Sequence, residues 1–342
     1  MKYRPPLDGL RALCAAAVFI FHASYGHTAG MLGVDVFFVL SGYLITRILL
    51  GDVESYGRVR YGRFYARRAR RLLPAVFVAL VLVFALMPRD QRWQFPRILP
   101  PVLLYYVNWR EAFDRPVAMV PHFWSLSTEE QFYLVWPLCV AVLAKLGRRR
   151  MAFVTGCLVV AFAAARAIFS GFPPPIGNLF GYFSTFSRAD ELLVGALAAI
   201  VHSSPDERWG EWITSWARRL AWPAATALLL CVVFGGQTRT WLLRGGFTAV
   251  ALASICVIVH GATGESSRLN RFLESRPLVW AGRRSYGIYV FHLPIIAAFE
   301  PLRHHGVVNF LGVTAARASV TLAVAWASYG LVESRILVSR RA

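Results

Sequence analysis

Charged residues are scarce in this chain, and acidic residues are the scarcest. Only 16% of its 342 residues are charged, and 18 Asp and Glu stand against 37 Lys and Arg. Soluble domains carry about a quarter charged residues, so this composition excludes an ordinary soluble domain. With 57% hydrophobic residues, gathered in recurring apolar runs of about 20, the chain is predicted to form an all-α, polytopic membrane bundle. We expect one domain over residues 1–342.

Signatures of several common enzyme classes are also missing. The sequence has no G-x-S-x-G elbow, no Walker A loop and no G-x-G-x-x-G, which disfavours a serine hydrolase, an ATP-driven machine and a dinucleotide enzyme. The five cysteines fall in apolar segments without C-x-x-C or metal-ligand spacing. We therefore expect them to serve packing, and we predict no metal site.

Ten apolar segments are candidate membrane spans. When the N-terminus is placed in the cytosol, most of the basic residues fall on cytosolic segments, so the positive-inside bias predicts that both termini are cytosolic. The net charge of +19 is thereby assigned to topology rather than to nucleic-acid binding. The predicted spans are residues 12–28, 31–50, 73–88, 129–146, 151–169, 188–203, 220–236, 246–262, 285–303 and 311–333.

Two apolar stretches need separate interpretation. The first resembles a signal peptide, but it has no clear small-residue cleavage site, and Asp8 and Arg11 adjoin it, so we predict a retained helix. The second, residues 98–109, is short and begins close to a proline pair. We expect it to be an external interfacial or re-entrant piece rather than a span.

The first helix carries Arg11 and His22, with ten mostly apolar residues between them. Eleven residues of α-helix return a side chain to nearly the same face, about 16 Å further along. Ionisable side chains at membrane depth normally face a protein interior or a water-filled path. The pair therefore indicates a functional site, since imidazole can accept a proton from a hydroxyl. The alternative is a buried histidine that bonds only to a neighbouring carbonyl.

The second helix begins with the segment GVDVFFVLSGYLIT, residues 33–46. Asp35 is expected at its outer edge, where it could orient or electrostatically stabilise a histidine of a neighbouring helix. Ser41 and Gly42 permit close helix packing.

An arginine-rich segment, RFYARRARRLLP, covers residues 63–74. It could be a topology signal alone. The alternative is anion binding, because guanidinium groups bind phosphate through two bonds at once. Arg68 and Arg71 lie three residues apart and would share a helix face.

A fourth segment, HFWSLSTEEQFYLVWP, covers residues 122–137. Ser127 is predicted as a helix N-cap, with Glu130 completing a capping box. This structural role leaves His122, Glu129 and Gln131 unexplained at the external mouth of the bundle.

Weaker signals lie further along the chain. Arg188, Asp190 and Glu191 fall at a helix start, where carboxylates suit the helix dipole. His292 falls in the middle of a predicted span, and Glu333 ends the last one.

The order of these segments resembles membrane acyltransferase family 3, bacterial proteins that O-acylate surface polysaccharides and some secreted natural products. The resemblance covers essentially the whole chain. It rests on the Arg-x10-His of the first helix, GVDVFFVLSGYLIT, RRARRLLP, HFWSLSTEEQFYLVWP and GRRSYGIYVFHLP, in that order.

The resemblance implies a membrane O-acyltransferase in the bacterial cytoplasmic (inner) membrane. Its donor would be acyl-CoA, with acetyl-CoA expected, on the cytosolic side. The acceptor would be a hydroxyl group of a carbohydrate or of another hydroxylated molecule, located in the cell envelope or secreted. No nucleic-acid partner and no metal are implied.

The resemblance also implies roles for particular residues. Arg11 and His22 are expected to be essential, and Arg68 and Arg71 match the family's Arg-x-x-Arg element. The remaining matches, within the segment at residues 122–137, are His122, Glu129 and Glu130.

The chain departs from the family in two places. Glu333 is followed by Ser334 and Arg335, where family members commonly have Glu-x-Pro, so no role is assigned to Glu333. The chain also stops shortly after the tenth predicted span, so we expect no appended esterase-like domain.

We hypothesise that inner-face arginines hold the phosphates of acyl-CoA. His22, oriented by Asp35, then removes the proton of the acceptor hydroxyl. A covalent acyl-histidine relay remains an alternative. A transporter or flippase of a polar envelope precursor would also place ionisable groups inside a bundle, but the arginines beside a histidine-bearing helix favour an enzyme. The density of buried polar residues disfavours a structural or assembly subunit.

Overall fold

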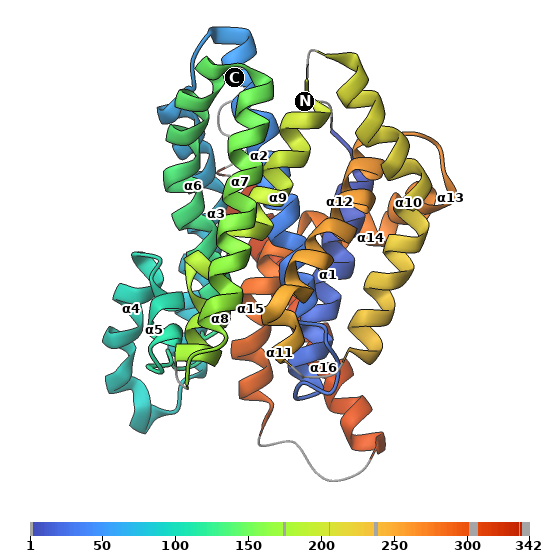
Figure 1. The fold of residues 1–342 in the computed structure, drawn as a ribbon. Coiled ribbons are helices and arrows are strands. Elements are labelled where there is room, and N and C mark those ends of the chain that lie inside the picture. The colour runs from blue at the N-terminus through green and yellow to red at the C-terminus, as the bar shows by residue number, and fades with distance from the viewer. Residues whose placement is uncertain are drawn as a thin grey trace.

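The computed structural model describes residues 3–173, 176–204, 206–235, 239–300, 307–334 and 336, and within them the chain is all-helical (Figure 1). Ten helices of 14 to 28 residues form the bundle: α1 (Pro5–Ala23), α2 (Leu32–Tyr56), α3 (Tyr61–Leu86), α6 (Phe123–Leu143), α7 (Arg148–Phe169), α9 (Thr185–His202), α10 (Glu207–Phe234), α12 (Phe247–Thr263), α15 (Ser285–Ala298) and α16 (Val307–Ser328).

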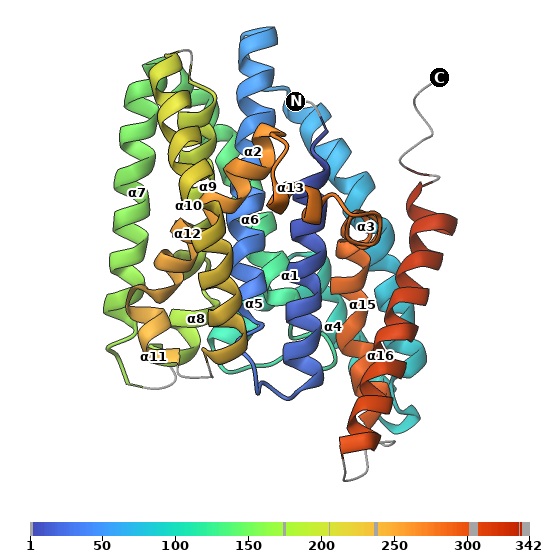
Figure 2. The same cartoon turned by 90° about the vertical axis from the view of Figure 1, so that its right-hand side faces the viewer.

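Shorter helices connect these elements. They are η1 (Arg89–Gln94), α4 (Phe95–Leu103), α5 (Val107–Ala112), η2 (Ala144–Leu146), η3 (Ile176–Phe180), α8 (Gly181–Phe183), α11 (Arg239–Trp241), η4 (Leu242–Gly246), α13 (Arg268–Leu273), α14 (Arg276–Arg283) and η6 (Tyr329–Glu333). In both views α1 begins at the upper end of the bundle, while α4, α5, α8 and α11 lie in its lower half (Figures 1 and 2).

Each of the ten predicted spans overlaps one of the ten long helices. Among the described helices, seven are long and apolar enough to cross a membrane: α1, α2, α3, α7, α10, α12 with η4, and α16 with η6. The other three are α6, α9 and α15. α9 carries three charged residues in its 18, and α15 has only 14 residues. The number of ten spans and the location of the termini remain predictions.

The observed boundaries differ from the predicted ones where a helix leaves its apolar stretch. α3 begins at Tyr61 rather than at residue 73, and α10 begins at Glu207 rather than at residue 220. Helical hydrogen bonding does not require apolar side chains, and arginine is a good helix former. Residues 98–109 fall in α4 and α5, neither of which is long enough to cross a bilayer.

Two glycines bring α2 and α9 into close contact. A Cβ on Gly42 would lie 1.9 Å from the carbonyl oxygen of Leu192, and a Cβ on Gly195 would lie 2.0 Å from that of Val39. Real atoms cannot approach so closely, so each helix presents a glycine to the other's backbone. The predicted close packing at Gly42 is confirmed.

Replacing Gly195 with alanine is expected to destabilise the protein by about 1–3 kcal/mol, because the new methyl group must push α2 and α9 apart. Gly62→Ala is the matched control: its Cβ would meet nothing within 4 Å, and alanine stabilises a helix by about 0.5–1 kcal/mol relative to glycine. Thermal unfolding in detergent compares the two. Equal melting temperatures would contradict the close packing.

Candidate functional site

A cavity of about 300 Å³, here called the central cavity, lies between α1, α2, α3, α6 and α15. Its charged lining consists of three arginines and one glutamate, so it is a cationic chamber inside a largely apolar bundle. These residues are Arg11, Arg68, Arg71 and Glu129; polar side chains on the same wall are Ser41, Ser125, Tyr133, Ser285, Tyr286 and Tyr289.

A second hollow of about 550 Å³, here called the vestibule, lies between α1, α2 and α3 near the end where α1 begins. It shares Arg11, Leu44 and Ile48 with the central cavity, so the two hollows adjoin. The vestibule is strongly basic. Its charged lining is Arg4, Arg11, Arg47, Arg60, Arg63 and Arg67 against Asp8 and Asp52.

Two of the vestibule arginines are engaged by its two carboxylates. Arg11 donates to Asp8 at 3.0 Å, and Arg60 donates to Asp52 at 2.8 Å. The hydrogen bond that the Arg60 guanidinium donates to Asp52 raises the pKa of Arg60. The other four arginines form no ion pair with any described residue, so the vestibule retains donors for an anionic ligand.

Arg68 and Arg71 both line the central cavity, as their shared helix face predicts. Arg68 is already engaged: its Nη2 donates to Glu130 Oε1 at 2.6 Å, and its guanidinium carbon lies 3.4 Å from the ring centroid of Tyr133. Arg71 forms no ion pair with a described residue. Arg71 is therefore the better placed of the two to contact a ligand, while Glu130 and Tyr133 fix Arg68 in the wall.

Glu129 lies on the same wall and accepts a hydrogen bond of 2.7 Å from the hydroxyl of Ser41. Ser41 comes from α2 and Glu129 from α6. This pair places a carboxylate inside the cationic chamber, where it can accept a proton or a hydrogen bond from a substrate.

Ser125 and Tyr289 also line the central cavity. Their hydroxyl oxygens lie 2.5 Å apart, and the Tyr289 hydroxyl donates to the backbone carbonyl of His122 at 2.9 Å. Both side chains are buried. We refer to this hydrogen-bonded pair as the partition, because three histidines lie on its far side.

These histidines come from three helices. His22 lies in the last turn of α1, His122 caps α6, and His292 lies within α15. The ring centroid of His292 lies 4.9 Å from that of His22 and 4.9 Å from that of His122. The Tyr289 ring centroid is 5.5 Å from that of His292. The residues that line the central cavity include Tyr289 but none of the three histidines.

The contacts of His292 and His22 assign their protons. His292 Nδ1 lies 2.5 Å from the carbonyl of Tyr289, which can only accept, so the neutral ring donates there and keeps a lone pair on Nε2. That Nε2 lies 3.1 Å from His22 Nδ1, which also lies 3.0 Å from the Val18 carbonyl. His22 must then carry its proton on Nδ1, which leaves the lone pair of its Nε2 available as a base or nucleophile.

His122 is more enclosed. Its Nε2 lies 3.2 Å from the carbonyl of Val290, and its buried Nδ1 has no partner among the described residues. The ring is therefore held between α6 and α15 with one unused lone pair.

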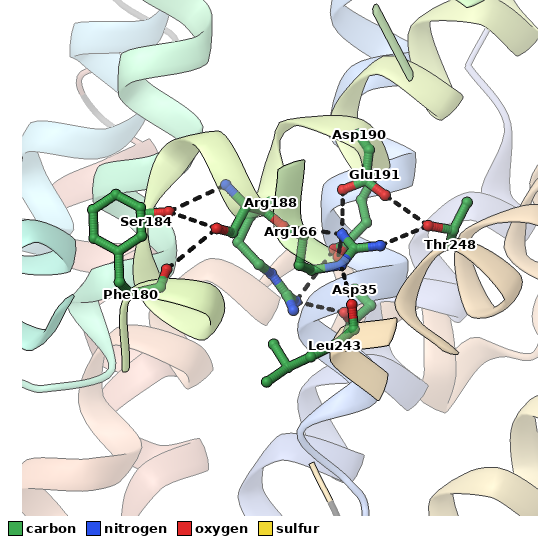
Figure 3. A network of polar contacts seen from close by, with 10 residues as sticks. Asp35, Arg166, Phe180, Ser184, Arg188, Asp190, Glu191, Leu243 and Thr248 are labelled. Atoms are coloured by element: carbon green, nitrogen blue, oxygen red, sulfur yellow. Dashed lines mark hydrogen bonds and ion pairs between the residues drawn. The ribbon is translucent and has the colours of Figure 1, made fainter. Parts of the chain in front are cut away.

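Asp35 lies in the first turn of α2, as predicted, but its described partner is an arginine (Figure 3). Arg188 Nη2 donates to Asp35 at 2.5 Å and lies 3.3 Å from Glu191. No described hydrogen bond joins Asp35 to a histidine. The expected orientation of His22 by Asp35 is therefore not a direct contact in this structure, and His292 contacts His22 instead.

The same buried network continues through Arg166, which the sequence places inside a span (Figure 3). Arg166 donates to Asp190 at 2.5 Å and to Thr248 at 2.6 Å, and the Thr248 hydroxyl donates to the other Asp190 oxygen at 2.9 Å. The network joins α2, α7, α9 and α12. Its two arginines and three carboxylates are all at most 1% exposed, so the helix-dipole role predicted for Asp190 and Glu191 is replaced by buried ion pairing.

The predicted capping box at Ser127 is wrong. α6 begins at Phe123, four residues earlier. The Ser127 hydroxyl donates to the Phe123 carbonyl and accepts from the backbone of Val107, and Glu130 pairs with Arg68. The N-cap pattern at Ser127 predicts a helix start there, but the apolar residues before it are also helical, so the helix begins earlier.

Two residues that the sequence analysis named without assigning them a role lie at the candidate site. Glu333 is buried, accepts a hydrogen bond of 2.9 Å from Ser328, and lines a small hollow together with Arg11 and Arg71. His292 completes the histidine cluster. Its signals in the sequence are an imidazole at membrane depth, as for His22, and its place in the segment GRRSYGIYVFHLP.

The described histidine, cysteine, aspartate and glutamate side chains include no group of three or more placed to hold a metal ion.

Comparison with known proteins gives one family and several relatives. The family model described as "Acyltransferase domain" matches residues 5–330. YrhL of Bacillus subtilis (strain 168) is 32% identical over 98% of this chain and 55% of its own length. The peptidoglycan O-acetyltransferase OatA of Listeria monocytogenes is 32% identical over 88% of this chain and 50% of its own.

A third relative, the O-acetyltransferase OatA of Staphylococcus aureus (strain NCTC 8325 / PS 47), is 31% identical over 86% of this chain and 51% of its own length. The chain thus spans about half the length of these relatives. No solved structure matches it.

Proposed function

The chain belongs to the family of acyltransferase domains, and from that membership we propose that it is a membrane O-acyltransferase. It moves an acyl group, with acetyl the first candidate, from cytosolic acyl-CoA to a hydroxyl of a carbohydrate or another envelope or secreted acceptor. The names of two relatives, a peptidoglycan O-acetyltransferase and an O-acetyltransferase, support acetyl transfer and a carbohydrate acceptor.

The observation that carries the proposal is the alignment of three features along the bundle. The basic vestibule adjoins the central cavity at Arg11, and the partition of Ser125 and Tyr289 stands between that cavity and the histidine cluster. A phosphorylated donor enters through the vestibule, and its thioester reaches His22 only when the Ser125–Tyr289 pair opens, because none of the three histidines lines the central cavity. We place both termini and the vestibule on the cytosolic side of the bacterial cytoplasmic membrane, with ten helices crossing it in a single domain.

In the proposed reaction, the Nε2 lone pair of His22 takes the proton of the acceptor hydroxyl. The oxygen attacks the thioester carbonyl, the C–S bond breaks, and the departing thiolate takes the proton back from the imidazolium. In the alternative relay, Nε2 attacks the thioester itself and then passes the acyl group to the acceptor. Arg11, which lines both the vestibule and the central cavity, offsets phosphate charge. Arg71 and Arg68 supply positive charge in the central cavity, where Glu129 accepts a hydrogen bond from a substrate.

His292 acts as a positioning residue in this scheme because its Nε2 fixes the proton of His22 on Nδ1. His292→Leu removes that acceptor and is expected to lower kcat by about tenfold or more, whereas His292→Gln supplies an amide oxygen and retains more activity. The pH dependence of kcat gives the diagnostic readout, since loss of this acceptor leaves the Val18 carbonyl as the one described partner of His22 Nδ1 and weakens the preference for that tautomer. Equal rates for both variants and the unchanged protein would contradict this role.

The test of the proposal is release of free thiol from acetyl-CoA by the purified protein, with acceptor glycans present and analysed by mass spectrometry. Thiol release coupled to acetylated acceptor supports the enzyme. Movement of an envelope precursor across a vesicle membrane without covalent change would instead identify a transporter or flippase.

A further inference from the structure

A third hollow lies beside the vestibule, at the same end of the bundle. It has a volume of about 430 Å³ and is bounded by the N-cap of α1, by α2 and α10, and by the ends of α9 and α12. We call it the side pocket. Its lining is Arg4, Tyr43, Arg47, His202, Thr214, Ala262 and Thr263.

Arg4 and Arg47 line both the side pocket and the vestibule. They therefore form the wall between two hollows, and each hollow receives positive charge from the same pair. Among the described side chains, no carboxylate lines the side pocket, and neither arginine forms an ion pair with a described residue. The pocket has the charge of an anion site without an internal counter-ion.

The side chains around the pocket are held in place. Arg47 Nη1 donates to the Ser203 hydroxyl at 3.2 Å, which leaves its other N–H groups available. Gly264, with φ of +72°, lets the Arg4 guanidinium approach so closely that a Cβ there would lie 1.9 Å from Nη1. The backbone conformation favours glycine at this position, and the Arg4 guanidinium lies directly against it.

A third donor comes from His202. The Tyr43 hydroxyl and His202 Nδ1 lie 2.7 Å apart, and the Tyr43 side chain is buried. When the hydroxyl donates, the neutral imidazole carries its proton on Nε2. Two guanidinium groups and an imidazole N–H around one small pocket match the acceptor oxygens of a phosphate group.

We propose that the side pocket binds a phosphate monoester, and that this group is the ribose 3′-phosphate of the acyl-CoA donor while the vestibule takes the pyrophosphate. The inference rests on the proposed function for its donor. Coenzyme A carries phosphate at two separated places, the pyrophosphate and the ribose 3′-phosphate, whereas a phosphopantetheine arm carries phosphate at one place. Two anion sites that share an arginine wall fit a donor with phosphate at two separated places. The side pocket therefore selects coenzyme A over donors that lack the 3′-phosphate.

The first test measures binding without transfer. Equilibrium dialysis of the purified protein compares adenosine 3′,5′-bisphosphate with adenosine 5′-monophosphate. The unchanged protein is expected to prefer the bisphosphate by about tenfold or more, since a charge-assisted hydrogen bond contributes at least that factor. Arg47→Gln and Arg4→Gln, made separately, are expected to abolish the preference. Arg149→Gln, an exposed arginine that lines none of the three hollows, is the charge-matched control and is expected to retain it.

The second test measures transfer. The KM ratio of 3′-dephospho-acetyl-CoA to acetyl-CoA is expected to be about tenfold or more in the unchanged protein. It is expected to approach one in Arg47→Gln, because this variant raises the KM of acetyl-CoA more than the KM of the dephospho donor. A ratio near one in the unchanged protein, or a ratio that persists in both Arg4→Gln and Arg47→Gln, would overturn the proposal.

Two further outcomes are informative. One distinguishes a lipid phosphate from the donor's phosphate, and the other distinguishes failure of the phosphate site from failure of the proposed function. If the unchanged protein retains more phosphatidic acid than Arg47→Gln, by mass spectrometry of bound lipid, and shows no nucleotide preference, the pocket takes a lipid headgroup and the assignment to the donor is wrong. If no donor supports transfer yet the variants lose the bisphosphate preference, the proposed function fails while the phosphate site stands. Melting temperatures of the variants confirm that they fold.

Discussion

Replacing His22 with glutamine is expected to lower the rate of acyl transfer by about 10²- to 10⁴-fold, the range that a positioned general acid–base group contributes. Glutamine fills similar space but cannot accept the hydroxyl proton. The hydrogen bonds of His22 involve Nδ1 alone, so the substitution leaves the helix intact. Thiol release and acceptor acetylation, measured on protein of unchanged melting temperature, provide the readout.

His27→Gln is the matched control for this substitution. His27 is exposed in the loop that follows α1, so its variant is expected to transfer acyl groups at the unchanged rate. A His22→Gln protein that keeps the full rate would refute the assignment of His22 as base or nucleophile.

Replacing Arg188 with methionine is expected to destabilise the protein by about 3–5 kcal/mol, the cost of leaving a buried charge without its partner. Arg188 is fully buried and faces both Asp35 and Glu191. Its removal leaves three buried carboxylates with Arg166 as the remaining cation of the network. The measurement is unfolding in detergent, followed by melting temperature and by the yield of folded protein.

Asp35→Asn is the informative comparison for Arg188→Met. It leaves two arginines and two carboxylates in the network, so the charges balance, and asparagine can still accept a bond from Arg188. We expect a clearly smaller loss of stability than in Arg188→Met. If Asp35→Asn is the more damaging of the two, the network does not depend on charge balance in the way proposed here.

The positions of the long helices could be predicted from the sequence, because an apolar run of suitable length leaves little choice of structure in a membrane. Their ends could not. α3 continues into an arginine-rich stretch and α6 begins before its apparent cap, since backbone hydrogen bonds persist beyond the apolar part of a helix.

The sequence indicated which residues belong to the candidate site better than it indicated which residues contact one another. His22 was identifiable because an ionisable group at membrane depth is costly, and Arg11 because it shares a helix face with His22. Glu129 was identified by the family resemblance. The partners were not identifiable, because Asp35 meets Arg188 and Arg68 meets Glu130 across 153 and 62 residues of sequence. Such pairings depend on helix packing, which one sequence does not specify.

The central claim is that the donor enters the bundle from the cytosolic side through the vestibule, and vesicle sidedness tests it most directly. Labelled acetyl-CoA, which does not cross membranes, is added outside sealed vesicles of cytoplasmic membrane that contain the protein. Inverted vesicles, which expose the vestibule in the proposed topology, are expected to transfer label to acceptor, and sealed right-side-out vesicles to do so only after detergent opens them. Equal transfer in both sealed preparations, or transfer only in the right-side-out one, would contradict the account.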